Sequence, residues 1–109
     1  HPITHDYRFH HGVDIPAPTG TNIGAARSGT VIEVGSTAAR GNYIKVQHDD
    51  GLVTLYQHCN SILAQQGDKV AQDQTIATVG STGKVTGPHL HLEVWKNGTA
   101  VDPMQYLGK

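Results

Sequence analysis

The sequence predicts an all-β domain, and three observations support this. Apolar and polar residues alternate in short runs, 13 glycines and 5 prolines are spread along the 109 residues, and two of the runs are followed by hairpin turn sequences. Strands that recur roughly every 8–12 residues with turns between them are typical of antiparallel sandwiches and barrels. We therefore expect an antiparallel sheet with little helix.

Five runs with a period of two residues are the expected strands, because successive side chains of a strand point to opposite faces. Asp49-Asp50-Gly51 joins two of the runs into a hairpin, and Asn97-Gly98 is a second turn sequence after the longest run. A weak helical period over 60–66 indicates a short helix or a turn, and Asp102-Pro103 could begin a last helical turn toward Tyr106 and Leu107. The expected strands are 30–34, 43–48, 52–56, 75–79 and 89–95.

Length and composition indicate one domain and exclude several kinds of protein. At roughly 100–200 residues per domain, the chain forms a single unit. Lys and Arg number 8 and Asp and Glu 9, a net charge of -1, so neither nucleic acid nor an anionic membrane is an expected partner. No apolar run approaches the roughly 20 residues that span a bilayer. The single cysteine, Cys59, excludes an intrachain disulfide and a cysteine-rich zinc site.

Histidine is the residue type that stands out. The chain has 8 histidines, while charged residues make up only 16 % of it, against about 25 % in average domains. Many imidazoles in a chain of low charge indicate a metal site or an acid–base site. A surface cluster of histidines is the plain alternative.

The first candidate site is the segment 10–14. In an extended chain, His10, Gly12 and Asp14 share one face, while Val13 and Ile15 on the other face belong to the core. Gly12 would leave room for an ion between His10 and Asp14. Imidazole and carboxylate are both good zinc ligands. The alternative is a surface histidine beside an aspartate in a turn.

The second candidate site is the strand that carries His89 and His91. Two imidazoles at positions i and i+2 of a strand share a face at a backbone spacing of roughly 6–7 Å, so both can reach one cavity. Glu93 shares that face and could orient a ligand imidazole, or could be a plain exposed glutamate. His58 lies at the end of the run 52–56. It becomes a candidate site residue only because of the other two candidate sites. Trp95 is expected to pack in the core on the Leu90 side.

Together these residues could form a hydrolytic zinc site, which has three protein ligands and an open position for water. His10, Asp14 and one of His89 or His91 would supply two neutral ligands and one anion. The ion would stay positive and lower the pKa of its water toward about 7. The remaining strand histidine and His58 would serve as general base and as donor to the developing oxyanion. The spacing alone leaves the roles of His89 and His91 open.

The candidate residues belong to a longer, ordered set of motifs. His10-x-x-x-Asp14 and His89-x-His91 are accompanied by Gly41-Asn42-Tyr43-Ile44, Leu55-Tyr56-Gln57-His58, Gly67-Asp68-Lys69-Val70, Gly80-Ser81-Thr82-Gly83 and Thr86-Gly87-Pro88. In this order, over nearly the whole chain, the motifs resemble those of the lysostaphin-type (LytM-like) zinc endopeptidases.

The resemblance implies a role for each candidate. His10, Asp14 and His91 would bind Zn²⁺, and His58 and His89 would be catalytic. Asn42 and Tyr56 could line the substrate groove, although Tyr56 is equally suited to be a core aromatic residue. Cys59 is expected to point away from the site.

The resemblance also implies the fold and the biological setting. The fold would be an antiparallel sheet that forms a narrow groove, related to the barrel-sandwich hybrid and its duplicated hybrid motif. The substrate would be a peptide of bacterial peptidoglycan, in a cross-bridge or a stem. The domain would work in the cell envelope or outside the cell as a monomer. Residues 1–109 would be one catalytic domain that lacks its first strand or was excised from a longer parent.

Two other functions are possible for such a sequence. One is a non-catalytic module of the same fold that binds the cell wall or activates other hydrolases; the retained ligand residues argue against it. The other is a lipoyl- or biotinyl-type carrier, suggested by Gly67-Asp68-Lys69-Val70. A carrier needs an acceptor lysine at a hairpin tip, and no lysine stands at the expected place.

Overall fold

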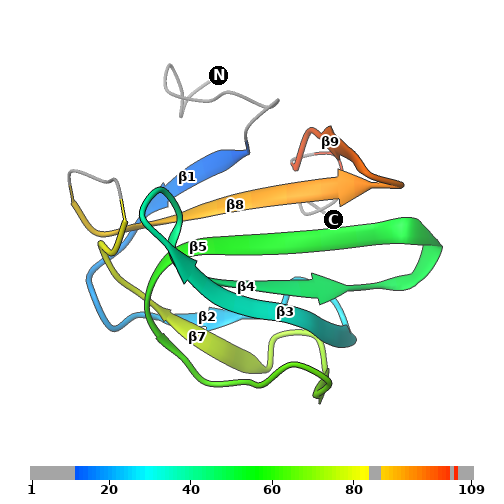
Figure 1. The fold of residues 1–109 in the computed structure, drawn as a ribbon, viewed down its shortest axis with the longest axis horizontal. Helices are drawn as coiled ribbons and strands as arrows, with labels where there is room; N and C mark the ends of the chain where they lie inside the picture. Colours follow the sequence, from blue (N-terminus) through cyan, green and yellow to red (C-terminus); the bar gives the residue numbers. More distant parts are fainter. Residues whose placement is uncertain (1–11, 84–86, 104, 106–109) are drawn as a thin grey trace.

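A computed structural model describes residues 12–83, 87–103 and 105, and in this part of the chain the strands form one open antiparallel sheet (Figure 1). The main path through the sheet is β1-β8-β5-β4-β3-β6, with β9 on β8 and β2 on β7. The all-β fold with little helix is thus confirmed. The strands are β1 (Val13–Pro16), β2 (Asn22–Gly24), β3 (Gly29–Thr37), β4 (Gly41–Gln47), β5 (Leu52–Ile62), β6 (Lys69–Val70), β7 (Thr75–Val79), β8 (His89–Lys96) and β9 (Thr99–Val101).

The long strand β5 connects two parts of the sheet. Its first part lies between β4 and β8, and its last part leaves β8 and pairs with β7 (Figure 1). The short helix considered at 60–66 is therefore wrong at Ser61 and Ile62, which continue β5 and pair with Thr78 and Ala77, whereas the alternative of a turn is confirmed at 66–67. Sheet pairing outweighs a weak local preference there. Within the described chain, no helix is both long and apolar enough to cross a membrane.

The turn expected at the end of the chain is only partly covered by the structure. The backbone N–H of Gln105 donates to the Asp102 carbonyl at 3.1 Å, as in a helical turn. The continuation toward Tyr106 and Leu107 lies outside the described residues.

The core lies on one face of the sheet, against β2 and β7. Tyr56 is 1 % exposed there, among apolar side chains of β3, β4 and β8. Its hydroxyl accepts a hydrogen bond from the Ala26 N–H at 2.9 Å and shares another with Thr54 Oγ1 at 2.7 Å. The structure thus places Tyr56 in the core and not in a groove.

The start of β1 differs from the expected extended segment. Gly12 has φ +102°, a backbone conformation outside the extended range, and His10 lies outside the described residues. A Cβ at Gly12 would collide with the Leu92 carbonyl of β8. Glycine at this position therefore allows close packing on β8. Val13 is buried as expected, but Ile15 is 43 % exposed because β1 is an edge strand.

Candidate metal and catalytic site

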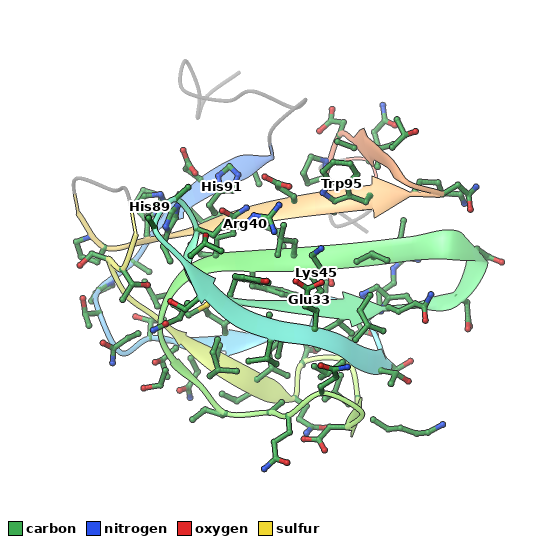
Figure 2. The ribbon with its side chains drawn as sticks, in the orientation of Figure 1. Glu33, Arg40, Lys45, His89, His91 and Trp95 are labelled. Atoms are coloured by element: carbon green, nitrogen blue, oxygen red, sulfur yellow. The ribbon has the colours of Figure 1, made fainter. Side chains whose placement is uncertain are left out.

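The pairing of β1 with β8 brings two of the predicted metal ligands together. Asp14 lies opposite His91 in the register, and Asp14 Oδ1 is 2.6 Å from His91 Nδ1. His89 Nε2 lies 3.5 Å from the same oxygen. His89 and His91 occupy the same end of β8 (Figure 2). A carboxylate oxygen and imidazole nitrogens thus converge on one point.

Glu93 holds the other side of His91. Glu93 Oε2 lies 3.0 Å from His91 Nε2 and accepts a hydrogen bond from Gln57 Nε2 at 3.0 Å, while Oε1 accepts one from Trp95 Nε1 at 2.9 Å. Its side chain is only 12 % exposed, so it is not the plain surface glutamate of the alternative interpretation. A carboxylate that accepts from Nε2–H leaves Nδ1 of His91 as the nitrogen available toward Asp14.

The contacts of Glu93 keep it ionised despite its burial. Burial alone would raise the pKa of Glu93, but hydrogen bonds from His91, Trp95 and Gln57 hold that pKa below its usual range. For His91, burial acts to lower the pKa, and the hydrogen bonds to Glu93 and Asp14 raise it. Two carboxylates therefore flank one imidazole, an arrangement that favours a cation.

Trp95 lies on the opposite face from the one expected. Residues 91, 93 and 95 share one side of β8, and the indole of Trp95 accordingly bonds to Glu93. The expectation that Trp95 packs on the Leu90 side is wrong, because a strand side chain at an even separation from His91 must share its face.

His58 reaches the site because β5 changes partners at this residue. Gln57 is the last β5 residue paired with β8, and Cys59 already pairs with β7. Between them, His58 has φ +66°, a left-handed conformation that is rare for residues other than glycine. Regular alternation would turn its side chain to the core beside Tyr56. Instead, the His58 ring centre lies 5.3 Å from that of His89.

Two chain segments, one with Arg40 and Asn42 and the other with Thr82, hold His58 in this conformation. His58 Nδ1 donates to the Thr82 carbonyl at 2.8 Å, and the backbone N–H of His58 donates to the Arg40 carbonyl at 2.8 Å. The carbonyl of the next residue, Cys59, accepts hydrogen bonds from Thr82 Oγ1 at 2.7 Å and Asn42 Nδ2 at 3.1 Å. Because Nδ1 carries the hydrogen, Nε2 of the neutral ring is free to accept a proton. Burial is the main cause of the lowered pKa of His58, so the neutral form is favoured.

Two glycines allow these segments to approach so closely. Gly41 and Gly83 have φ +67° and +81°, and a Cβ on either residue would collide with the other segment, at Thr82 or at Gly41. Asn42, expected to line the groove, uses its amide to bind β5 instead. The motifs 41–44 and 80–83 therefore build one support for His58. Sequence reasoning gave Thr82 no role; its position between glycines was the available signal.

A cavity also lies on the sheet face that carries His91 and Glu93. A cavity of about 260 Å³ is lined by Trp95 of β8, Leu55 and Val53 of β5, Lys45 of β4, and also by Ile32, Arg40 and Gly98. A second hollow of about 270 Å³ opens at the histidines themselves, between Asp14, Pro16, Gly87, Pro88 and His89. Tyr56 and Asn42 line neither cavity.

The third predicted ligand, His10, lies outside the described residues. Within residues 12–83, 87–103 and 105, no three side chains of His, Cys, Asp or Glu are arranged to hold a metal by themselves. The donors that the structure does describe, Asp14 and His91, suit Zn²⁺ in type, and a hydrogen-bonded carboxylate behind a ligand imidazole is common at zinc sites.

An open antiparallel sheet with clustered histidines beside a surface hollow is an arrangement suited to a metallopeptidase. Comparison with known proteins agrees. The family model described as Peptidase family M23 matches residues 8–103. The chain therefore belongs to peptidase family M23.

Individual relatives show the same similarity. Peptidoglycan DD-endopeptidase ShyC of Vibrio cholerae serotype O1 is 43 % identical over 103 residues, which cover 94 % of this chain and 24 % of that protein. The chain thus spans about a quarter of the length of this relative. The catalytic domain of the antimicrobial peptidase lysostaphin from Staphylococcus simulans has 37 % identity and a TM-score of 0.86, covering 92 % of this chain and 80 % of that one. A zinc-containing peptidase from Vibrio cholerae has 38 % identity and a TM-score of 0.85, covering 95 % and 32 %.

Proposed function

We propose that this domain is a zinc-dependent endopeptidase that hydrolyses peptide bonds of bacterial peptidoglycan. The observation that carries the proposal is the convergence of Asp14 Oδ1, His91 Nδ1 and His89 Nε2 beside His58. Membership in a peptidase family and the naming of ShyC as a peptidoglycan endopeptidase support the reaction and the substrate. The zinc in a related peptidase structure supports the choice of metal.

In this proposal, His10, Asp14 and His91 hold the metal. When bound, Zn²⁺ would act as a Lewis acid, polarising a carbonyl group and lowering the pKa of a water molecule. Glu93 keeps Nδ1 of His91 directed at Asp14, and Gln57 and Trp95 keep Glu93 in place. Such supporting contacts determine how well a ligand imidazole is aligned.

His58 and His89 move protons in this proposal. The Nδ1 atoms of both rings lie close to main-chain carbonyls, those of Thr82 and Gly87, at 2.8 and 3.1 Å. Because a carbonyl only accepts, each neutral ring then has an unprotonated Nε2. One ring takes a proton from the attacking water, and the other, once protonated, donates a hydrogen bond to the substrate carbonyl oxygen as negative charge develops.

The setting of the domain follows from its substrate. A peptidase of cell-wall peptides works in the cell envelope or outside the cell. We propose that residues 1–109 act there as one monomeric catalytic domain.

Two alanine variants test the assignment. His91→Ala should lose both zinc and cleavage of purified peptidoglycan, whereas His89→Ala should keep zinc and lose cleavage. Zinc is measured by atomic absorption after gel filtration, and cleavage by mass spectrometry of released fragments. Lys69→Gln, on an exposed residue of β6, is the control and should retain both. Normal zinc content in both alanine variants would overturn the assigned roles. Full cleavage after complete metal removal would overturn the mechanism, and a zinc-loaded domain that cuts no wall peptide would point to a non-catalytic module.

A further inference from the structure

The cavity at Trp95 is linked to the proposed metal site through Glu93. Glu93 bonds to His91 on one side and to Trp95 on the other, and Trp95 is a wall of the 260 Å³ cavity. Leu55 and Val53 of the neighbouring strand also line the cavity. A peptide that lies across the metal site along this face would therefore pass over an apolar surface next.

The rim of this groove carries two cations, Arg40 and Lys45, beside one carboxylate, Glu33. Glu33 uses Oε1 to pair with Lys45 Nζ at 3.3 Å and Oε2 to accept from the Tyr43 hydroxyl. The guanidinium carbon of Arg40 lies 5.3 Å from the centre of the Tyr43 ring. No carboxylate of the described residues forms an ion pair with Arg40, and its charge acts on Glu33 from a longer distance, where it adds to the hydrogen bond from Tyr43 in lowering the pKa of that carboxyl. Glu33, Lys45 and Arg40 together leave one positive charge in the groove.

Arg40 is also fixed close to the reacting groups. Its carbonyl accepts the backbone N–H of His58 at 2.8 Å, so its backbone is bound directly to the histidine segment. In the view of Figure 2, Arg40 is labelled between His91 and Lys45. Because its backbone is bound to the His58 segment, we expect Arg40 to meet a substrate residue near the cleaved bond.

We propose that Arg40 is a specificity-determining residue that binds a free carboxylate on a substrate residue close to the cleaved bond. The planar guanidinium can donate two parallel hydrogen bonds to a carboxylate, and the apolar surface of Leu55, Val53 and Trp95 would take the aliphatic part of the same residue. This inference rests on the proposed function and narrows its substrate.

The substrate class that fits is a stem peptide of peptidoglycan with a free carboxylate. A glycine cross-bridge has neither a side chain for the apolar surface nor a carboxylate for Arg40. The groove therefore favours stem peptides over glycine bridges, and favours those whose carboxylate is free over those in which it is amidated.

The experiment compares two cross-linked stem peptides that differ only in this group, a free carboxylate in one and a primary amide in the other. The zinc-loaded domain should cut the free-acid peptide with a kcat/KM at least about tenfold higher, the range expected for a charged hydrogen bond. Arg40→Gln should remove this preference by slowing only the free-acid peptide. Zinc content should be unchanged, because the main-chain carbonyl that holds His58 is kept. Lys69→Gln, outside the groove, should keep the preference.

Binding is measured separately on His89→Ala by titration calorimetry, so the inference is decided even if no peptide is cut. The free-acid peptide should bind at least about tenfold more tightly than the amide, and adding Arg40→Gln should abolish the difference. Three results would each overturn the role of Arg40. The first is an equal kcat/KM for the two peptides, and the second is equal or absent binding of the two peptides. The third is an equal loss of kcat/KM on both peptides in Arg40→Gln. Cleavage of both peptides at the same rate would be consistent with the proposed peptidase function. Tighter binding of the free-acid peptide without cleavage of either peptide would contradict only the proposed peptidase function.

Discussion

His58 Nδ1 donates to the main-chain carbonyl of Thr82 at 2.8 Å, and the hydroxyl of the same threonine donates to the carbonyl of Cys59 at 2.7 Å. One residue thus holds both the ring and the adjacent backbone of a proposed catalytic histidine. Asn42 adds a second hydrogen bond to the Cys59 carbonyl. These contacts stabilise the left-handed conformation of His58. Without them, His58 would leave this conformation more readily.

Thr82 is therefore expected to act as a positioning residue. Thr82→Val removes the hydroxyl at nearly constant volume and should lower kcat roughly 10- to 100-fold through misplacement of His58, with little change in KM. Thr82→Ser keeps the hydroxyl and should restore most of the activity. Steady-state kinetics on a defined wall peptide, together with zinc content, measure this. A drop in melting temperature with unchanged kcat would show that Thr82 contributes only to stability.

Glu93 should determine how tightly the metal is held. Glu93→Gln can still accept a hydrogen bond from His91 but loses the charge, and Glu93→Ala loses the contact altogether. We expect zinc affinity to fall about 10- to 100-fold in the alanine variant and less in the glutamine variant. Competition with a chromophoric chelator gives the affinity. Glu33→Gln, a carboxylate paired with Lys45 away from the histidines, is the control; an equal loss there would rule out a specific role.

Gly41 and Gly67 offer a matched pair for stability. Both have positive φ, +67° and +96°, but a Cβ at Gly41 would collide with Thr82, whereas nothing lies within 4 Å of one at Gly67. Gly67→Ala should cost about 1–2 kcal/mol, from backbone strain alone. Gly41→Ala should cost clearly more, because it also forces β4 away from the Thr82 segment. Urea unfolding measures both, and equal losses would contradict the packing explanation.

The thiol of Cys59 should be unreactive in the folded protein. Burial raises the pKa of its thiol to about 12 from an ordinary value of about 9. At pH 8 iodoacetamide should therefore modify Cys59 only after unfolding, as followed by intact mass. Between pH 9 and 12 the folded chain keeps a proton that the unfolded chain releases, so this group lowers the free energy of unfolding as pH rises. Rapid labelling of the native protein at pH 8 would contradict this placement.

The alternation of residues along β8 was sufficient to predict that His89, His91 and Glu93 share a face, because this strand is regular. Applied correctly, the same alternation also places Trp95 on that face. The position of His58 was beyond such reasoning, since one left-handed residue reverses the face on which a side chain emerges. The exposure of Ile15 depends on β1 being an edge strand, which period-two patterns do not reveal.

The supporting residues were harder to predict than the candidate ligands. Asp14 and His91 carry chemistry in their residue types, whereas Thr82 acts mainly through a main-chain carbonyl that any residue possesses. Arg40 becomes a candidate because no carboxylate of the described residues forms an ion pair with it. Glu33 forms its ion pair with Lys45 instead. Such relationships arise from strand register and appear only when the chain is folded.

The hydrogen bond from the His58 backbone to the Arg40 carbonyl limits how this domain can be re-engineered. The turn between β3 and β4 is an attractive place to exchange residues when a new cleavage preference is wanted. Any graft that changes the length of that turn also moves the carbonyl on which the histidine backbone depends. Side-chain replacement at a fixed turn length is therefore the safer route to altered selectivity, and libraries that vary loop length should yield many folded but inactive clones.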